Sequence, residues 1–223
     1  MKKVILAGNA VTARIMQGYL AGDDRYAVVA AVVDDAYVTA GSDLGVECVG
    51  IGEIHQRCSP SVHVVIMAAG YGNLNRTRQS LFERLKERGY AIETYVHPDA
   101  RIYTRYPLGE GSIVLPGAVV EPNARVGADT LIWCNATVAH DSAVAEHCWI
   151  ASGAVIAGQA AVGRNTFVGV NATIVDQVTV GEFNIIGGAS MISKCTKPNT
   201  VHLARSAEVF RYGADDYAKF FRA

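Results

Sequence analysis

Hydrophobic residues recur at every sixth position through the second half of the chain, without a miss. They are Val96, Ile102, Leu108, Val114, Val120, Val126, Ile132, Val138, Val144, Ile150, Ile156, Val162, Val168, Ile174, Val180, Ile186 and Ile192. This period matches neither the 3.6-residue repeat of an α-helix nor the two-residue alternation of a β-strand. A period of six is typical of a parallel β-helix made of hexapeptide repeats. The pattern therefore predicts a β-helix over residues 96–196.

Small residues and glycines accompany this hydrophobic series. The residue two positions earlier is usually small, as at Ala118, Ala136 and Ala154. A glycine often follows the hydrophobic residue directly, at Gly109, Gly127, Gly163, Gly169, Gly181 and Gly187. We expect each repeat to point one large and one small side chain inward, with glycine relieving backbone strain at tight corners.

Before residue 96, short apolar segments alternate with amphipathic ones. The pattern predicts strands over residues 4–7, 26–33, 62–68 and 92–96, and helices over residues 13–20 and 76–89. Continuously apolar strands that alternate with helices are typical of a small parallel, Rossmann-like α/β sheet. We therefore expect an α/β domain over residues 1–95, the β-helix over residues 96–196, and a tail over residues 197–223. Short helices in that tail would pack their aromatic residues on the β-helix or on a neighbouring subunit.

Composition restricts the classes of function. Half of the residues are hydrophobic and the net charge is −1, which argues against disorder and against binding of nucleic acid. No apolar run is long enough to span a membrane, and residues 1–10 fit a buried strand better than a signal peptide. The five cysteines form no C-x-x-C pair, so we expect small buried thiols in a cytoplasmic protein without a metal site.

The ends of three predicted strands, at residues 8–12, 34–35 and 69–73, are candidate ligand sites, because ligands of open α/β sheets bind beyond the carboxyl ends of the strands. Gly8 begins a turn before a helix, whose N-terminus suits a phosphate. Asp34 and Asp35 follow the second strand and suit a ribose or a base. A turn without a ligand role remains the alternative. The turn lacks the later glycines of G-x-G-x-x-G, so it does not predict a nicotinamide dinucleotide.

His140 and Asp141 are the candidate catalytic residues of the repeat region. Transfer of an acyl group from a thioester to an amine or a hydroxyl requires a base that works near neutral pH. Imidazole suits this role, and a carboxylate beside its other nitrogen would orient the ring and stabilise the imidazolium that forms.

Four segments carry a resemblance to a known family: residues 135–142 (NATVAHDS), 153–158 (GAVIAG), 162–165 (VGRN) and 168–172 (VGVNA). Nearly the whole chain resembles bacterial nucleotide-sugar acyltransferases, which include UDP-4-amino-sugar N-acetyltransferases and sialic acid O-acetyltransferases. The resemblance implies a left-handed β-helix, a homotrimer, and acetyl-CoA or another acyl-CoA bound between neighbouring prisms, with no metal.

The resemblance also implies roles for single residues. It identifies His140 as the general base with Asp141 as its partner, and it places acetyl-CoA contacts at Val170 and Gly188. It places the sugar nucleotide at Ala10, Val11, Thr12, Asp34 and Asp35. Trp149 stands where the family often has a second histidine that contacts acyl-CoA, while His147 lies two positions away. These departures leave the nucleotide and the acyl group open.

The resulting hypothesis is an acyl-CoA-dependent N-acyltransferase, most simply an N-acetyltransferase, that acts on a nucleotide-linked 4-amino-4,6-dideoxy sugar for glycan synthesis. Acetylation of a hydroxyl on a sugar or sialic acid is one alternative, because it needs the same base. A non-catalytic trimeric sugar-binding protein is another, and a nicotinamide-dependent enzyme is a third.

Overall fold

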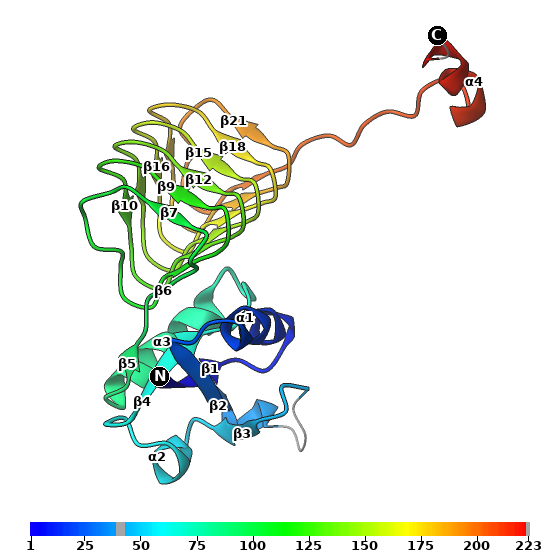
Figure 1. Ribbon diagram of the computed structural model, residues 1–223. Helices are drawn as coiled ribbons and strands as arrows, with labels where there is room; N and C mark the ends of the chain where they lie inside the picture. Colours follow the sequence, from blue (N-terminus) through cyan, green and yellow to red (C-terminus); the bar gives the residue numbers. More distant parts are fainter. Residues whose placement is uncertain (39–42, 222–223) are drawn as a thin grey trace.

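The computed structural model describes residues 1–38 and 43–221. Figure 1 shows an N-terminal α/β domain, a three-sided β-helix stacked beside it, and a C-terminal tail that extends away from both. The last two residues of the predicted tail lie outside the described residues. Within the described part of the chain, no helix is long and apolar enough to cross a membrane.

The N-terminal domain is a parallel five-stranded sheet with helices on its two faces. Its elements are β1 (Lys2–Ala7), α1 (Val11–Ala21), β2 (Tyr26–Val33), the 3-10 turn η1 (Asp35–Tyr37), β3 (Glu47–Gly50), α2 (Ile54–Arg57), β4 (His63–Met67), α3 (Arg76–Glu87) and β5 (Ala91–Ile92). The strand order is β3-β2-β1-β4-β5. The chain therefore crosses from one side of β1 to the other after β3. The carboxyl ends of β1 and β4 thus form the switch point at which such sheets bind ligands.

The predicted parallel sheet is confirmed, with two differences. Strand β3 and helix α2 were not predicted, because β3 has only four residues and only Val49 and Gly50 among them are buried. The strand predicted over residues 92–96 is two strands. β5 ends at Ile92 and pairs with β4, whereas β6 (Tyr95–Val96) pairs with β8 in the β-helix. The hydrophobic pattern runs through this point because both strands are apolar.

The β-helix has three faces of short parallel strands. The seven-stranded face contains β6, β8 (Ile113–Val114), β11 (Leu131–Ile132), β14 (Trp149–Ile150), β17 (Phe167–Val168), β20 (Ile185–Ile186) and β22 (Val201–His202). The six-stranded face contains β7 (Arg101–Ile102), β9 (Val119–Val120), β12 (Thr137–Val138), β15 (Val155–Ile156), β18 (Thr173–Ile174) and β21 (Met191–Ile192). The four-stranded face contains β10 (Arg125–Val126), β13 (Ala143–Val144), β16 (Ala161–Val162) and β19 (Thr179–Val180).

The second residue of these strands points inward and builds the core, as the hydrophobic period predicts. The inward series from Val114 to Ile192 is buried together with the small residues Ala118, Ala136 and Ala154. Each strand pairs with the equivalent strand one coil away, as Leu131 does with Trp149. Three hexapeptides therefore form one coil, and the core is a column of stacked layers built from similar residues.

The corners of the β-helix are built differently from our expectation. The left-handed backbone conformation falls three residues after the inward residue, at positions such as Asn123, Asp141 and Asn165, with φ of 62°, 57° and 55°. Asparagine and aspartate tolerate this conformation better than most residues. The glycines that follow the inward residues serve close packing instead: a Cβ on Gly127 would lie 2.5 Å from the backbone nitrogen of Glu146 in the next coil.

The seven-stranded face packs against the N-terminal domain through its outward residues. Leu131 and Trp149 share one buried hydrophobic cluster with Ala13, Met16 and Leu20 of α1. Large apolar residues at outward positions every eighteen residues, beginning at β6, could have predicted this contact. These outward residues are Tyr95, Ile113, Leu131, Trp149, Phe167 and Ile185. The contact fixes the position of the α/β domain relative to the β-helix.

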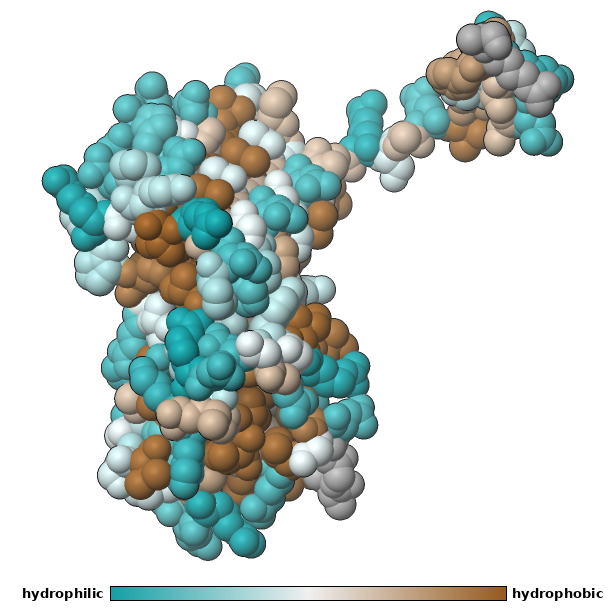
Figure 2. Space-filling model, viewed as in Figure 1, coloured by the Kyte–Doolittle hydropathy of each residue, from teal (hydrophilic) through white to brown (hydrophobic). Residues whose placement is uncertain are grey.

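The predicted C-terminal helices are present as α4 (Ala214–Ala218) and the 3-10 turn η2 (Lys219–Phe221). Their aromatic side chains contact one another, as Tyr217 does with Phe210 and Phe221, and remain exposed. Figure 2 shows hydrophobic side chains on the surface of this tail. In a single chain the tail therefore does not pack on the β-helix.

The five cysteines are free thiols. Cys58 and Cys148 are buried as expected, and burial raises the pKa of the Cys148 thiol to about 12. Cys195 is exposed, contrary to the expectation of uniformly buried thiols, because it follows the last complete coil. No cluster of three His, Cys, Asp or Glu side chains suited to a metal occurs among the described residues.

Candidate functional site

His140 lies at the edge where the six-stranded face meets the four-stranded face, between β12 and β13. Its Nδ1 is 3.0 Å from Oδ2 of Asp141. A carboxylate accepts only, so Nδ1 carries the proton and Nε2 is left with a free lone pair. The side chains of His140 and Asp141 are 56% and 47% exposed, so the pair is open to a substrate. This geometry suits a general base.

Asn123 holds the carboxylate of Asp141 in place from the previous coil. Its Nδ2 donates a hydrogen bond of 3.0 Å to Oδ1 of Asp141, 18 residues later in the chain. The hydrogen bonds from His140 and Asn123 lower the pKa of Asp141 from its ordinary value. The carboxylate therefore stays charged beside the imidazole. A search at a spacing of 18 residues from Asp141 would have found Asn123 in the sequence.

The backbone around His140 is also constrained. Glu121 accepts a hydrogen bond of 2.8 Å from the backbone N–H of His140. On the other side, a Cβ added to Gly158 would lie 2.6 Å from Nε2 of His140. Only glycine at this position leaves room for the imidazole ring. Glu121 and Gly158 were not identified from the sequence, because their contacts arise from stacking of successive coils.

Replacing Asn123 by glycine tests the support of the dyad. Glycine accepts the left-handed backbone of this corner, so only the hydrogen bond to Asp141 is lost. We expect turnover to fall by about tenfold, as for a hydrogen bond to a charged group that is partly open to water. The measurement is steady-state kinetics beside Gln177→Gly, a corner residue of similar conformation two coils beyond Asp141. Equal turnover in both variants would contradict the role of Asn123.

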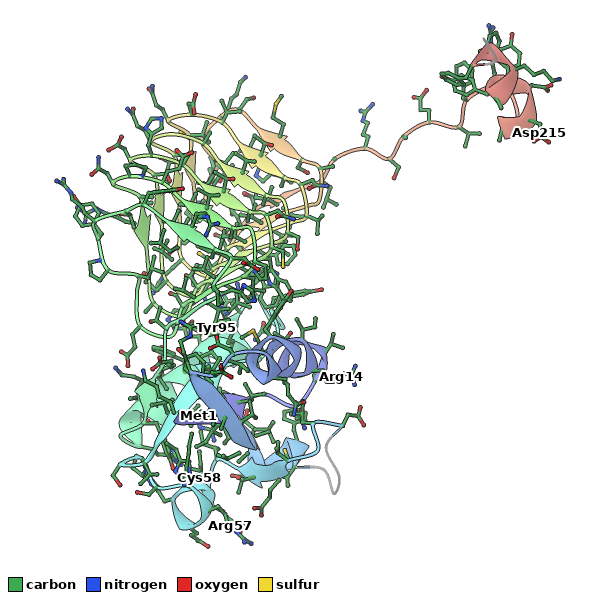
Figure 3. All side chains as sticks on the ribbon, viewed as in Figure 1. Met1, Arg14, Arg57, Cys58, Tyr95 and Asp215 are labelled. Carbon is green, nitrogen blue, oxygen red and sulfur yellow. The ribbon has the colours of Figure 1, made fainter. Side chains whose placement is uncertain are left out.

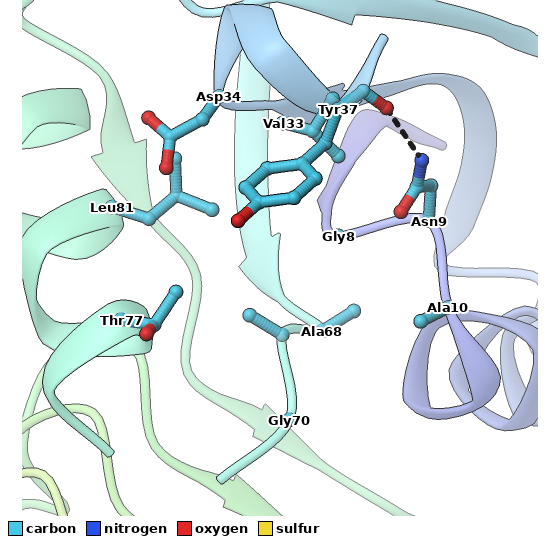
Figure 4. Close-up of a pocket in the computed structure, with 11 residues that line it drawn as sticks. Gly8, Asn9, Ala10, Val33, Asp34, Tyr37, Ala68, Gly70, Thr77 and Leu81 are labelled. Atoms are coloured by element: carbon cyan, nitrogen blue, oxygen red, sulfur yellow. Dashed lines mark hydrogen bonds between the residues drawn. The ribbon is translucent and has the colours of Figure 1, made fainter. Parts of the chain in front are cut away.

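A pocket lies at the switch point of the N-terminal sheet (Figure 4). Gly8, Asn9 and Ala10 line it on one side, and Thr77 and Leu81 of α3 line the other. Gly8 has φ of 134°, and a Cβ there would lie 2.7 Å from the carbonyl oxygen of Ala68. Glycine is therefore required where the ends of β1 and β4 approach each other.

The first turn of α1 opens into this pocket with no side-chain cap. Ala10 is its N-cap residue and makes no side-chain hydrogen bond to the helix. The first backbone N–H groups of a helix have no partner within it and favour an anion. Ala10 and Gly8 line the pocket, whereas Val11 is 58% exposed outside it and Thr12 is buried. Of the residues in this turn expected to bind the ligand, the structure thus brings Gly8 and Ala10 to the pocket.

The two acidic residues after β2 point in different directions. Asp34 lines the pocket and forms an ion pair with Arg84 of α3. Asp35 turns away and accepts a hydrogen bond of 2.9 Å from the backbone N–H of Gly52. Tyr37, which was not predicted, adds an exposed aromatic ring to the pocket wall.

Of the three residues expected at the acyl-CoA, Val170 and Gly188 lie together and Trp149 lies apart from them. Val170 and Gly188 stack on the edge between the seven-stranded and six-stranded faces, where a Cβ on Gly188 would lie 3.2 Å from the carbonyl oxygen of Val170. Val170 is 53% exposed. Trp149 is 5% exposed and lies between the β-helix and the N-terminal domain, with Tyr71 and Trp133 against its ring. The structure therefore does not place Trp149 beside Val170 and Gly188.

His147 belongs to a buried polar cluster between the domains. Its Nδ1 is 2.8 Å from Oδ2 of Asp129, and Nε of Arg78 is 3.4 Å from the same oxygen. Nη2 of Arg78 also donates to the carbonyl oxygens of Asp129 and Cys148. Burial lowers the pKa of Arg78, an effect that the nearby Asp129 opposes. This cluster joins α3 to the β-helix rather than facing a ligand. Figure 3 labels Tyr95, which lies at the same junction between the α/β domain and the β-helix.

Comparison with known proteins gives strong matches among solved structures. The acetyltransferase domain of PglB from Neisseria gonorrhoeae, in complex with acetyl coenzyme A, has a TM-score of 0.81 and 24% identity over 91% of this chain and 96% of that chain. PerB from Caulobacter crescentus, in complex with CoA and GDP-perosamine, has a TM-score of 0.79 and 25% identity over 92% of this chain and 94% of that chain. No protein-family model and no curated protein sequence matches.

These matches agree with the resemblance seen in the sequence. The related structures are acetyltransferases crystallised with acetyl-CoA or CoA, and the arrangement of an α/β domain before a left-handed β-helix is shared. Over more than nine-tenths of its length, the chain is therefore similar to the hexapeptide-repeat nucleotide-sugar acyltransferases, as the sequence indicated.

Proposed function

We propose that this protein is an acyl-CoA-dependent N-acyltransferase that acts on a nucleotide-linked 4-amino-4,6-dideoxy sugar. The observation that carries the proposal is the exposed His140–Asp141 dyad, in which Nδ1 is bonded and Nε2 is free. A pocket lined by Gly8 and Asp34, on a different domain from the dyad, supports the proposal of a bound nucleotide. Relatives that bind CoA and GDP-perosamine support the pairing of these two substrates.

The proposed chemistry needs one base and no covalent enzyme intermediate. The sugar amine attacks the thioester carbonyl, a C–N bond forms, and the C–S bond breaks. Nε2 of His140 takes the proton that the nitrogen loses and returns it to the sulfur of the leaving CoA. The charged Asp141 stabilises the imidazolium between these two transfers. Asn123, Glu121 and Gly158 hold the ring and the carboxylate in position.

An acceptor panel tests this function. The purified protein is incubated with acetyl-CoA and with amino-sugar nucleotides or their hydroxyl counterparts, and release of free CoA thiol is measured together with the product mass. We expect thiol release and a product heavier by one acetyl group only with the amine. Turnover of the hydroxyl compound alone would replace N-acylation by O-acylation. No turnover with either acceptor, despite nucleotide binding, would favour a binding protein.

We also propose that the working unit is a homotrimer with each active site between two prisms. His140 and Val170 lie on different edges of one prism, so one chain alone does not place the base beside the proposed acyl-CoA contacts. A three-fold arrangement brings the His140 edge of one chain to the Val170 edge of the next, and closed cyclic symmetry is usual for homo-oligomers.

Subunit complementation tests the trimer. We expect light scattering to give three times the 23.7 kDa mass of one chain. His140→Ala and Val170→Glu should each be inactive alone, and co-refolding them should restore part of the activity, because some mixed trimers contain an interface with both native residues. Mixed trimers that stay inactive while the native protein refolds to full activity would contradict a shared site.

A further inference from the structure

The pocket at the switch point has a second polar group besides the N-terminus of α1, namely the carboxylate of Asp34, which is paired with Arg84. Asp34 comes from the end of β2, and Arg84 of α3 pairs with its carboxylate from just outside the lining residues. Figure 4 shows the Asp34 carboxylate on the side of the pocket opposite Asn9 and Ala10. A nucleotide with its phosphates at α1 would therefore extend its base toward Asp34.

We propose that this pair selects guanine, so that the substrate is a GDP-linked sugar. The inference rests on the proposed function for the presence of a nucleotide, and it adds the identity of the base. The hydrogen-bonding groups at this end of the pocket match the edge of guanine better than the edges of the other bases.

A carboxylate beside a guanidinium offers acceptors next to donors. Guanine presents two adjacent donors, N1–H and the N2 amino group, followed by the acceptor O6. Both oxygens of Asp34 can accept from the two donors while Arg84 donates to O6. Uracil and thymine present one donor between two carbonyl oxygens, so the second carboxylate oxygen of Asp34 would face an acceptor. Adenine and cytosine each offer only one donor group on that edge.

The surroundings of the pair also favour a purine. The exposed ring of Tyr37 lines the pocket beside Asp34, and Leu81 lines it from α3. Nδ2 of Asn9 donates a hydrogen bond of 3.1 Å to the carbonyl oxygen of Tyr37, which ties η1 to the turn after β1. An aromatic ring held in this way provides a stacking surface, whose contribution grows with the size of the base.

Binding of GDP, UDP, dTDP, ADP and xanthosine diphosphate, measured by calorimetry on the full chain, tests the inference. We expect GDP to bind at least tenfold more tightly than UDP or dTDP, since an unmatched polar group in a site carries a penalty of this order or more. Asp34→Asn should weaken GDP by about tenfold or more and make xanthosine diphosphate the preferred ligand, because the new amide can donate to the xanthine O2.

Asp24→Asn is the matched control, because Asp24 is an exposed carboxylate in the turn between α1 and β2, outside the residues that line the pocket. It should leave the ranking of the nucleotides unchanged, and circular dichroism should confirm that both variants fold. An equal loss for every nucleotide in Asp34→Asn would assign Asp34 to the ribose and overturn the inference. Preference of the native protein for UDP or dTDP would also overturn it.

Different results would contradict the proposed acyl transfer and the proposed guanine specificity. Acetyl transfer to a UDP- or dTDP-linked amino sugar through His140 would leave the proposed function standing and remove the guanine specificity. Tight GDP binding that switches to xanthosine diphosphate in Asp34→Asn, without acetyl transfer to any GDP-linked amino sugar, would retain the specificity and remove the proposed function.

Discussion

His140→Ala is expected to lower kcat by about 10²–10⁴-fold, the range that a positioned general base contributes. The loss follows from the geometry, because the imidazole Nε2 is the free atom of a dyad whose other nitrogen is bonded to Asp141. Since the side chain is 56% exposed, its removal should change the melting temperature little. Steady-state kinetics with acetyl-CoA and an amino-sugar nucleotide, together with thermal unfolding, measure both effects.

His63→Ala provides the control for this variant. His63 lies at the amino end of β4, away from the pocket and from the β-helix edge, and its Nδ1 contacts the carbonyl oxygen of Ser59. It should keep native turnover. Turnover near the native value in His140→Ala would exclude His140 as the base, and a large fall in its melting temperature would assign it a structural role instead.

Arg78→Met is expected to destabilise the protein by about 3–5 kcal/mol, the usual cost of removing one partner from a buried ion pair. The side chains of Arg78 and Asp129 are both completely buried, and the loss of Arg78 leaves the Asp129 charge with His147 alone. It also removes a hydrogen bond of 3.1 Å to the carbonyl oxygen of Cys148. Denaturant unfolding measures the change in the free energy of unfolding.

Two further variants separate the ion pair from the helix. Glu87→Met removes an exposed charge from the last turn of the same helix and should change stability by less than about 0.5 kcal/mol. Arg78→Met combined with Asp129→Asn should recover part of the loss, because the double variant no longer buries an unpaired charge. A loss below about 1 kcal/mol in Arg78→Met would contradict the importance of this pair at the domain junction.

Much of the fold could be predicted because its main pattern is local. The inward residues of the β-helix, such as Ile132 and Ile150, lie one coil apart in a strictly repeated frame, so one correct assignment extends along the whole prism. The apolar strands of the N-terminal sheet were recognisable for the same reason. The short strand β3 and the division between β5 and β6 were not recognisable. Their bounds depend on which strands they pair with, and not on hydrophobicity.

The candidate site was predictable only in part. His140 and Asp141 are neighbours in the chain, and the structure brings their side chains together. Asp34 and Asp35 are also neighbours, yet they point into different surroundings, which adjacency does not reveal. Trp149 occupies an outward position of the β-helix, and the sequence does not show whether such a residue contacts a ligand or the other domain. The structure places it against Tyr71 and Trp133, in the junction.

The six-residue period by itself determined that this protein has a β-helix, because each hexapeptide meets the same packing requirement as the ones above and below it. Tertiary structure decided everything that depends on contacts across the coils and between the domains. It brought Asn123 to Asp141, left space for His140 over Gly158, and paired Asp34 with Arg84 across the sheet. The physical reason is that side-chain direction and distance at these points are set by stacking and by the domain junction, neither of which leaves a local pattern in the chain.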